Sequence, residues 1–537
     1  MLLQKAYHCD VFVVGSGIAG ISAALTAAES GADVILACKG NLFSGCSFYP
    51  GTWGLGLIGP ADPADEADLA RTIQDVGCGM ADPEMVKAFV SGIQPAIARV
   101  RNMGVKLRRP ANAGETAFIP CFDHKHRDWN GIEFDSAREI FSQKLKEHHI
   151  RVLPQCEVLE LVKDRNRVCG AVMAWEGKLR YVGCGAVVLA TGGYGSIFKY
   201  HLCTEDVLGI GQHLALEAGC RLVNMEFMQM IPGYIAPAYK TVFNEKTFRY
   251  ARLKKADGSP LLNPGEAAQL ELRSTHGPFT CRLPSKAIDL ALFDAFRKDE
   301  AGIGVSYSEA VWTDPPEFVK VYFDWLLQAK GLSPKDPIQI GAFAHAANGG
   351  IRIRPDASTG VAGLFAAGEV TGGMHGADRI GGLSTANGLV FGTIAGRSAS
   401  AYAAEADGCP GEYEFAALAA EDLDGKRKAL QQLMFENAMI ARCEAGLSSA
   451  LEAVRQLHGE VTQSRKPSTD PSAVTRTHRL LARLNTAESV LQAALLRRES
   501  RGSHYRTDFP QQDDTLEKQI IIHLDADGIH AEFTKGA

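Results

Sequence analysis

Residues 10–39 read DVFVVGSGIAGISAALTAAESGADVILACK. Residues 11–14 are wholly apolar, as in a parallel strand that is buried on both faces. A GSGIAG turn, a stretch with helical apolar spacing and a second apolar run follow in order. This order predicts a βαβ unit in which Gly15 makes the tight turn, Gly17 lets a pyrophosphate approach, and Gly20 packs helix against strand. The free N–H groups of the helix behind Ser16 would bind the pyrophosphate.

The second strand of this unit lacks the acid that usually binds the ribose of a dinucleotide. It ends in Leu36, Ala37, Cys38 and Lys39. Either another group holds the adenosine, or the chain belongs to a subfamily with a different strand end.

Two later segments repeat the pattern of an apolar strand followed by small residues. They are GAVVLATGGYG at 185–195 and GVAGLFAAGEVTGG at 360–373. NAD-binding folds rarely need three such strands over roughly 360 residues, whereas flavoproteins with a long inserted domain commonly do. The sequence therefore favours FAD over NAD as the cofactor.

The composition excludes several classes of protein. The 537 residues carry a net charge of -6 without a long basic block, so we expect no nucleic-acid partner. The thirteen cysteines form no CxxC pair and no cluster with metal-ligand spacing, which predicts no metal site and no iron–sulfur centre in this chain. No apolar run reaches the roughly 18 residues of a membrane span, and the N-terminus leaves no room for a signal peptide. We expect a cytoplasmic protein without a membrane span.

Further segments, in order, resemble motifs of one flavoprotein family, that of fumarate reductase, succinate dehydrogenase and L-aspartate oxidase. The resemblance covers nearly the whole chain. It is carried by CSFYPGTWG at 46–54, DHKHRDWNG at 123–131, LEAGCRLVNMEFMQMIPG at 216–233, HAANGGI at 345–351, GLFAAGEVTGGMHGADRIGGLSTANGLVFG at 363–392 and RRESRGSHYRTDFP at 497–510.

The resemblance implies an α/β protein with a Rossmann-like FAD-binding domain on a parallel sheet, an inserted α+β capping domain and a C-terminal helical domain. We expect the FAD-binding domain at 1–226 plus 340–400, the capping domain at 227–339, the helical domain at 415–510, and a tail with a β-hairpin at 511–537. Within these domains the apolar spacing predicts helices at 316–332, 414–423, 426–461 and 478–500.

The resemblance also assigns the FAD-binding residues. Succinate and fumarate enzymes attach FAD covalently through a His, and Cys46 stands at that place, so we expect non-covalent FAD. The full predicted set is Gly15, Ser16, Gly17, Ala19, Gly20, Lys39, Cys46, Ser47, Val158, Thr191, Gly192, Glu369, Leu383 and Ser384. In the family, Glu369 would lie along the ribityl chain, and the glycines of 372–382 would make room for the flavin ring.

Family chemistry is hydride exchange between flavin N5 and a carbon next to a carboxylate. By resemblance, His345 and Arg379 hold one substrate carboxylate, and a guanidinium fork suits that task. Lys286 stands where the family has a catalytic arginine and is the predicted proton donor, with Arg282 as its rival. Glu245 and Arg249 are further candidates, because the register of 243–258 against the family is open.

The other half of the family's carboxylate clamp is altered. Its His-Pro-Thr reads Ile231-Pro232-Gly233 here. Burying a second carboxylate against Ile231 without a partner would cost several kcal/mol. We therefore expect a small-molecule substrate with one carboxylate and a bulkier or apolar far end, and not fumarate itself.

Three alternatives remain open at this stage. The chain is an L-aspartate oxidase, or it is the flavoprotein subunit of a complex with an iron–sulfur or other electron-transfer protein, or it carries a flavin without catalysis. The first alternative would release peroxide on oxidation of aspartate, and the second would co-purify with the iron–sulfur protein.

Overall fold

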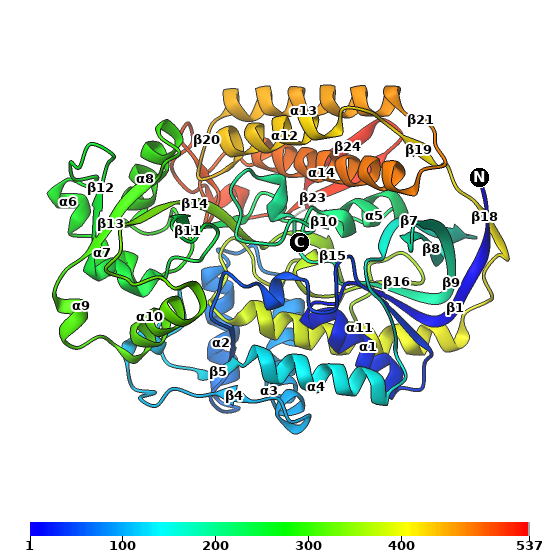
Figure 1. Ribbon diagram of the computed structural model, residues 1–537, viewed down its shortest axis with the longest axis horizontal. Coiled ribbons are helices and arrows are strands. Elements are labelled where there is room, and N and C mark those ends of the chain that lie inside the picture. Colours follow the sequence, from blue (N-terminus) through cyan, green and yellow to red (C-terminus); the bar gives the residue numbers. More distant parts are fainter. Residues whose placement is uncertain (535–537) are drawn as a thin grey trace.

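The computed structural model describes residues 1–534 and is built around an eight-stranded sheet (Figure 1). Its order is β6-β2-β1-β9-β8-β7, with β16 beside β9 and β18 beside β1. The strands are β1 (Leu2–Val14), β2 (Val34–Ala37), β6 (Arg151–Leu153), β7 (Glu157–Asp164), β8 (Arg167–Trp175), β9 (Lys178–Leu189), β16 (Leu364–Ala366) and β18 (Glu412–Glu414). Strands β6, β2, β1, β9 and β16 are parallel to their neighbours in this series. The parallel Rossmann-like sheet that the sequence predicted is therefore confirmed.

Helices cover this sheet, and two of them pack unusually closely. They are α1 (Ile18–Glu29) and α11 (Leu383–Glu405). A Cβ on Gly392 or Gly396 of α11 would come within 2.5 Å of Ala19 O or 2.3 Å of Ala23 O of α1. Only glycine permits this contact between the helix that begins the fold and the helix that follows the 372–382 loop. The helices α2 (Asp65–Val76), α3 (Pro83–Asn102) and α4 (Phe134–Glu147) lie on the same side of the molecule in Figure 1.

A small antiparallel sheet and a larger one flank the central domain. The small one has the order β3-β5-β4, with β3 (Leu55–Gly59), β4 (Leu107–Arg108) and β5 (Asp128–Ile132). The larger one forms the cap and has the order β11-β14-β13-β12, with β11 (Met228–Ala236), β12 (Ala251–Lys254), β13 (Ile303–Tyr307) and β14 (Ile338–Ala347). The cap helices are α6 (Pro264–Ala267), α7 (Leu270–Arg273), α8 (Lys286–Lys298), α9 (Ala310–Thr313) and α10 (Glu317–Lys330).

Two cap features compare directly with the sequence predictions. Helix α10 confirms the helix predicted at 316–332. Strand β14 pairs with β11 as far as Ala347, so the expected domain boundary at 339/340 falls inside this strand.

The C-terminal region consists of three long helices and a hairpin. Helices α12 (Leu423–Ala438), α13 (Glu444–Ser464) and α14 (Pro471–Leu496) lie together along the top of Figure 1. The hairpin joins a five-stranded sheet, β17-β15-β10-β23-β24. Its strands are β10 (Leu222–Val223), β15 (Gly350–Arg352), β17 (Thr371–Gly372), β23 (Ile520–Asp525) and β24 (Gly528–Phe533). Residues 535–537 of the predicted tail lie outside the described residues.

Two helix predictions in this region are wrong. Residues 414–423 do not form a helix, because 412–414 pair with the N-terminal end of β1 and β19 (Leu418–Ala419) pairs with β21 (Lys466–Pro467). The single helix predicted at 426–461 is interrupted by β20 (Ala441–Arg442), which pairs with β22 (Tyr505–Arg506). In both cases the backbone pairs as a strand with a segment that is distant in the sequence. Local apolar spacing does not reveal such pairing.

Buried ion pairs join the C-terminal region to the rest of the protein. Arg497 Nε contacts Glu226 Oε1 at 2.7 Å, and its Nη1 contacts Glu499 Oε1 at 2.7 Å. All three side chains are fully buried, so the loss of one partner would leave an uncompensated charge. Within residues 1–534 no helix combines the length and the apolar character that a membrane span requires.

Candidate functional site

The glycine turn after β1 forms the floor of a deep cavity. Gly15 has φ +111°, and a Cβ there would meet Ala190 O at 2.2 Å. A Cβ on Gly20 would meet Gly15 O at 1.8 Å, so this glycine packs α1 onto the turn. Gly17 is different, because the contact that its Cβ would make is with Ser47 Oγ at 3.3 Å. Its open side faces the cavity, as close approach of a ligand requires.

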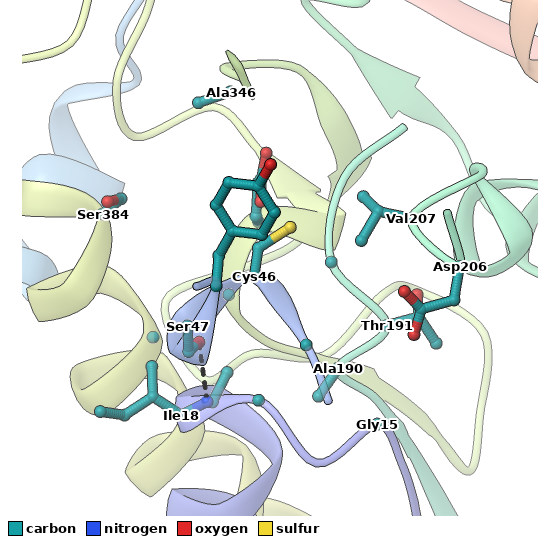
Figure 2. Close-up of a pocket in the computed structure, with 18 of the residues that line it drawn as sticks. Gly15, Ile18, Cys46, Ser47, Ala190, Thr191, Asp206, Val207, Ala346 and Ser384 are labelled. Atoms are coloured by element: carbon teal, nitrogen blue, oxygen red, sulfur yellow. Dashed lines mark hydrogen bonds between the residues drawn. The ribbon is translucent and has the colours of Figure 1, made fainter. Parts of the chain in front are cut away.

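The start of α1 is available to an anion. Gly17 is its N-cap, and no side chain caps the helix in the usual way. Ile18 N donates to Ser47 Oγ at 3.0 Å, which is the dashed line in Figure 2. Cys46, Thr191 and Ser384 surround the same space in Figure 2. The backbone amides at this position fit a pyrophosphate, which helix N-termini bind through N–H groups and the helix dipole.

Most of the predicted residues line one cavity, whose volume is about 380 Å³. The predicted residues on its wall are Gly15, Ser16, Gly17, Ala19, Lys39, Cys46, Ser47, Val158, Thr191, Gly192, His345, Glu369, Arg379 and Ser384. Gly20 and Leu383 lie behind the wall, each on one of the two closely packed helices. The structure does not bring Lys286 to this cavity.

The end of the cavity near β2 contains charged residues that the sequence did not suggest. Lys39 Nζ lies 3.7 Å from Glu157 Oε2, and Arg479 Nε donates to the same oxygen at 2.7 Å. Burial lowers the pKa of Lys39 to about 8. Glu157 is the carboxylate at the end that lacks the expected ribose acid, and it comes from β7 rather than β2. His478 and Arg479 of α14 also line the cavity.

Glu369 lies in the middle part of the cavity. Its Oε1 accepts a hydrogen bond from Ala347 N at 2.9 Å, and a Cβ on Gly193 would come within 2.5 Å of the same oxygen. Burial raises the pKa of this carboxyl. The side chain therefore fixes two backbone segments of the wall relative to each other.

Arg379 and His345 line the end of the cavity that the cap closes. Arg379 is 7% exposed, and its Nε donates to Gln229 Oε1 at 3.1 Å. No ion pair joins its guanidinium to an acid in residues 1–534. Burial, with a contribution from Arg379, lowers the pKa of His345 to about 3, and its Nδ1 has no hydrogen-bond partner among the described residues. Arg379 and His345 both line this part of the cavity, and a charged fork beside a neutral imidazole suits a single carboxylate.

The remaining wall of this end is largely apolar. Ile231 and Val242 line it together with Pro278. Cys121 Sγ donates to Glu245 Oε1 at 3.2 Å, and both residues are on the wall. The structure places Glu245, the first residue of the short helix η4 (Glu245–Tyr250), on the wall of the cavity, while the register of 243–258 against the family stays open.

The other three charged candidates lie elsewhere. Lys286 is the first residue of α8, and its Nζ lies 5.5 Å from the ring centroid of Tyr505. Arg249 Nη2 donates to Ser274 Oγ at 3.0 Å. Arg282 Nε pairs with the fully buried Asp378 at 3.1 Å. This structure gives no geometric support for proton donation by Lys286.

The glycines of the 372–382 loop require a correction to the expected cause. A Cβ on Gly372 would meet Gly350 N at 2.6 Å, and one on Gly376 would meet Gly77 O at 2.6 Å. These two glycines are needed because the loop packs against the protein's own backbone. Gly381 and Gly382 line the cavity, but a Cβ on Gly382 would likewise meet the protein, Ile58 Cγ1 at 2.2 Å, and one on Gly381 would meet Cys121 N at 3.2 Å. The expected role of making room for the flavin therefore stays a prediction for these two glycines.

Comparisons with known proteins identify the family. A family model described as an FAD binding domain matches residues 10–247 and 309–385, and one described as the fumarate reductase flavoprotein C-terminus matches 427–533. One subunit of the CoM/CoB fumarate reductase of Methanothermobacter marburgensis is 27% identical over 554 residues, covering 97% of this chain and 98% of that protein. An L-aspartate oxidase of Halobacterium salinarum is 29% identical and covers 94% and 98%.

Solved structures show the same fold. Mycobacterium smegmatis Sdh1 in complex with UQ1 superposes with a TM-score of 0.82 at 23% identity, covering 99% of this chain and 94% of that one. The E. coli quinol fumarate reductase superposes with a TM-score of 0.80 at 24% identity, covering 99% and 97%. The FAD model covers more than half of the residues and includes the glycine turn whose geometry fits a dinucleotide. The chain therefore belongs to the fumarate reductase, succinate dehydrogenase and L-aspartate oxidase family of FAD-dependent oxidoreductases.

Proposed function

We propose that this oxidoreductase reduces the double bond of an enoate with one carboxylate, or catalyses the reverse reaction. The observation that carries the proposal is the Arg379–His345 pair, which faces the same cavity as the glycine turn and has no acid partner within the described residues. FAD held at the glycine turn would, once reduced by an electron donor, supply a hydride to a substrate carbon, and in the reverse reaction the oxidised flavin would accept it.

Arg379 binds the substrate carboxylate and stabilises the negative charge that develops as the double bond is polarised. The guanidinium is nearly enclosed, so its field acts with little screening by water. His345, with its pKa lowered to about 3, is neutral across the physiological range and adds a hydrogen bond without adding charge. Together the two side chains orient one end of the substrate.

Glu245 is the side chain that we assign to proton movement at this end of the cavity. Its Oε1 accepts the thiol hydrogen of Cys121, whose pKa burial raises to about 12, so the thiol stays protonated. Glu245 lines the cavity, whereas Lys286 does not. A carboxyl group on the wall can pass a proton to the carbon next to the one that receives hydride.

The wall beside this pair argues against a second substrate carboxylate. Ile231 is 6% exposed and offers no polar atom beyond its backbone. A buried carboxylate without a partner costs several kcal/mol, so fumarate is a poor ligand for this cavity. The same argument weighs against aspartate, although several relatives of comparable identity are named L-aspartate oxidase.

The electron donor is part of the proposal as well. One relative is named as a component of a fumarate reductase with more than one type of chain, and by analogy this chain receives electrons from an iron–sulfur or other redox protein. Co-purification of such a protein from the native host would support this analogy. An aspartate oxidase would instead release peroxide from aspartate without any partner.

The test uses the FAD-loaded chain with reduced methyl viologen as donor. We expect turnover of crotonate, an enoate with one carboxylate, at a rate on the order of 1 per second or more, and no comparable turnover of fumarate. Glu245→Gln is expected to slow crotonate reduction while flavin content stays constant. Efficient fumarate reduction by the unmodified chain would contradict the single-carboxylate assignment.

A further inference from the structure

A second cavity, of about 260 Å³, opens from the substrate end of the first. The two share the wall residues 53–56, Cys121, Glu245, Gly381 and Gly382. Because Arg379 lines the first cavity and the two cavities share this stretch of wall, a ligand held by that arginine can extend into the second space. The second cavity lies between the β3-β5-β4 sheet and helix α10 of the cap, which contribute Trp129 and Phe318 to its wall.

The wall of this second cavity is aromatic. Phe118, Trp129 and Phe318 form a cluster in which ring centroids are 5.3 Å (Phe118–Trp129) and 5.4 Å (Phe118–Phe318) apart. Trp53 meets Phe318 at 6.0 Å with an interplanar angle of 88°. Rings that meet edge to face leave further faces and edges free for another aromatic ring.

The charged residues on the wall of this second cavity carry both signs: Arg108 and Lys246 with Glu133 and Glu245. The guanidinium of Arg108 lies 5.6 Å from the centroid of Trp129, and burial lowers its pKa while Glu133 and Glu317 oppose that effect. Lys246 Nζ donates to Ile119 O at 3.3 Å. Because acids and bases balance on a wall that is otherwise aromatic, the cavity favours a flat group without net charge.

We propose that the second cavity binds the aryl group of the substrate, so that the substrate class is the aryl-substituted acrylates. The inference rests on the proposed enoate reduction and names the far end of its substrate. Apolar cavities of roughly 150 Å³ hold benzene, so the space is sufficient for a phenyl ring. The carboxylate lies on Arg379 and His345, and the ring lies among Phe118, Trp129 and Phe318.

The experiment compares cinnamate with crotonate, which shares the enoate but lacks the ring, using the FAD-loaded chain and reduced viologen. We expect kcat/KM for cinnamate to exceed that for crotonate by about tenfold or more. Phe318→Leu should lower kcat/KM for cinnamate by about tenfold and change that for crotonate by less than about twofold. Phe323→Leu is the matched control, because Phe323 lies on the same helix but packs against Tyr307 and Trp312 outside both cavities.

The binding of cinnamate to the oxidised protein is measured by the quenching of tryptophan fluorescence. This measurement separates the two proposals. If crotonate is reduced as well as cinnamate and Phe318→Leu affects both alike, the aryl assignment is overturned and the enoate reaction stands. If neither acid is reduced but Phe318→Leu weakens cinnamate binding and Phe323→Leu does not, the aryl site stands and the reaction fails. If cinnamate is neither reduced nor bound while crotonate is reduced, the aryl assignment alone is overturned. If neither acid is reduced and cinnamate does not bind, both proposals are overturned.

Discussion

The two ends of the large cavity, which we propose bind the cofactor and the substrate, differ in the groups that they present to a ligand. At the cofactor end the glycine turn at 15–17 and the start of α1 present backbone N–H groups. At the substrate end Arg379, His345 and Ile231 present side chains. A site made of backbone tolerates changes in its side chains, whereas a site made of side chains can change its ligand with one substitution. This difference explains how relatives can share FAD and differ in substrate.

The largest effect is expected when a side chain obstructs the backbone site at the cofactor end. Gly15→Ala places a Cβ 2.2 Å from Ala190 O at a positive φ, and we expect the folded protein to lose its flavin and about 3 kcal/mol of stability. Flavin absorbance per chain after gel filtration measures the effect. Gly31→Ala is the control, because Gly31 also has a positive φ but no atom within 4 Å of its Cβ, so it should cost only about 1 kcal/mol and keep the flavin.

Changing the side-chain end should leave the cofactor in place. Arg379→Gln removes the charged fork, and we expect kcat/KM for the enoate to fall by about 1000-fold, at constant flavin content. Arg273→Gln alters another buried arginine, which pairs with Asp289 in the cap. It should lower stability without a selective loss of substrate turnover. A flavin-free Arg379→Gln protein would show that the two ends are not independent.

A pH titration can test the contact that Asp378 makes between the 372–382 loop and the cap. Asp378 Oδ2 accepts from Thr280 Oγ1 at 2.7 Å and from Arg282, so it ties the 372–382 loop to the cap. Burial raises the pKa of Asp378 to about 7. The pKa of an aspartate in the unfolded chain is near 4, well below the folded value of Asp378. Between these two pKa values the native protein binds more protons than the unfolded chain, so the free energy of unfolding falls as pH rises.

We expect the unfolding free energy to drop by about 2 kcal/mol from pH 5 to pH 7 on account of this group. Asp378→Asn should remove that part of the slope in urea titrations. An unchanged slope in the variant would mean that Asp378 is ionised throughout this range.

The smallest effect is expected at the charged cluster near β2. Arg479→Gln removes the ion pair with Glu157, and we expect the Kd for FAD to rise by about fivefold, or roughly 1 kcal/mol. Arg476→Gln, on the exposed side of the same helix, should leave the Kd unchanged. If both variants bind FAD with equal affinity, the side chain of Arg479 does not contribute to cofactor binding, and the backbone site alone accounts for it.

The features that were predictable from the sequence are those set by short stretches of chain. The turn at Gly15, Gly17 and Gly20 has its sequence signal within one strand and one helix, and helix α10 has its signal in its own apolar spacing. The pairing of 441–442 with 505–506 was not predictable, because the strand partner is distant in the sequence.

At the substrate end, the sequence likewise could not show which single residues face the cavity. Glu245 reaches the cavity and Lys286 does not, although Lys286 stands in a segment that resembles a family motif and Glu245 stands in one whose register is open. One residue of shift along a helix turns a side chain by about 100°, so motif likeness alone cannot decide which charge faces the substrate. Arg479 had no local signal, because it completes a site whose other members lie more than 300 residues earlier.

That position of Arg479 has a consequence for biosynthesis. Helix α14 supplies His478 and Arg479 to the wall of the cavity, and it is translated long after the glycine turn at 15–17. The wall is therefore incomplete until α14 has been made and has packed against the sheet. We expect flavin to bind fully only after that step, so that a chain truncated before α14 would fold around an unfinished binding site.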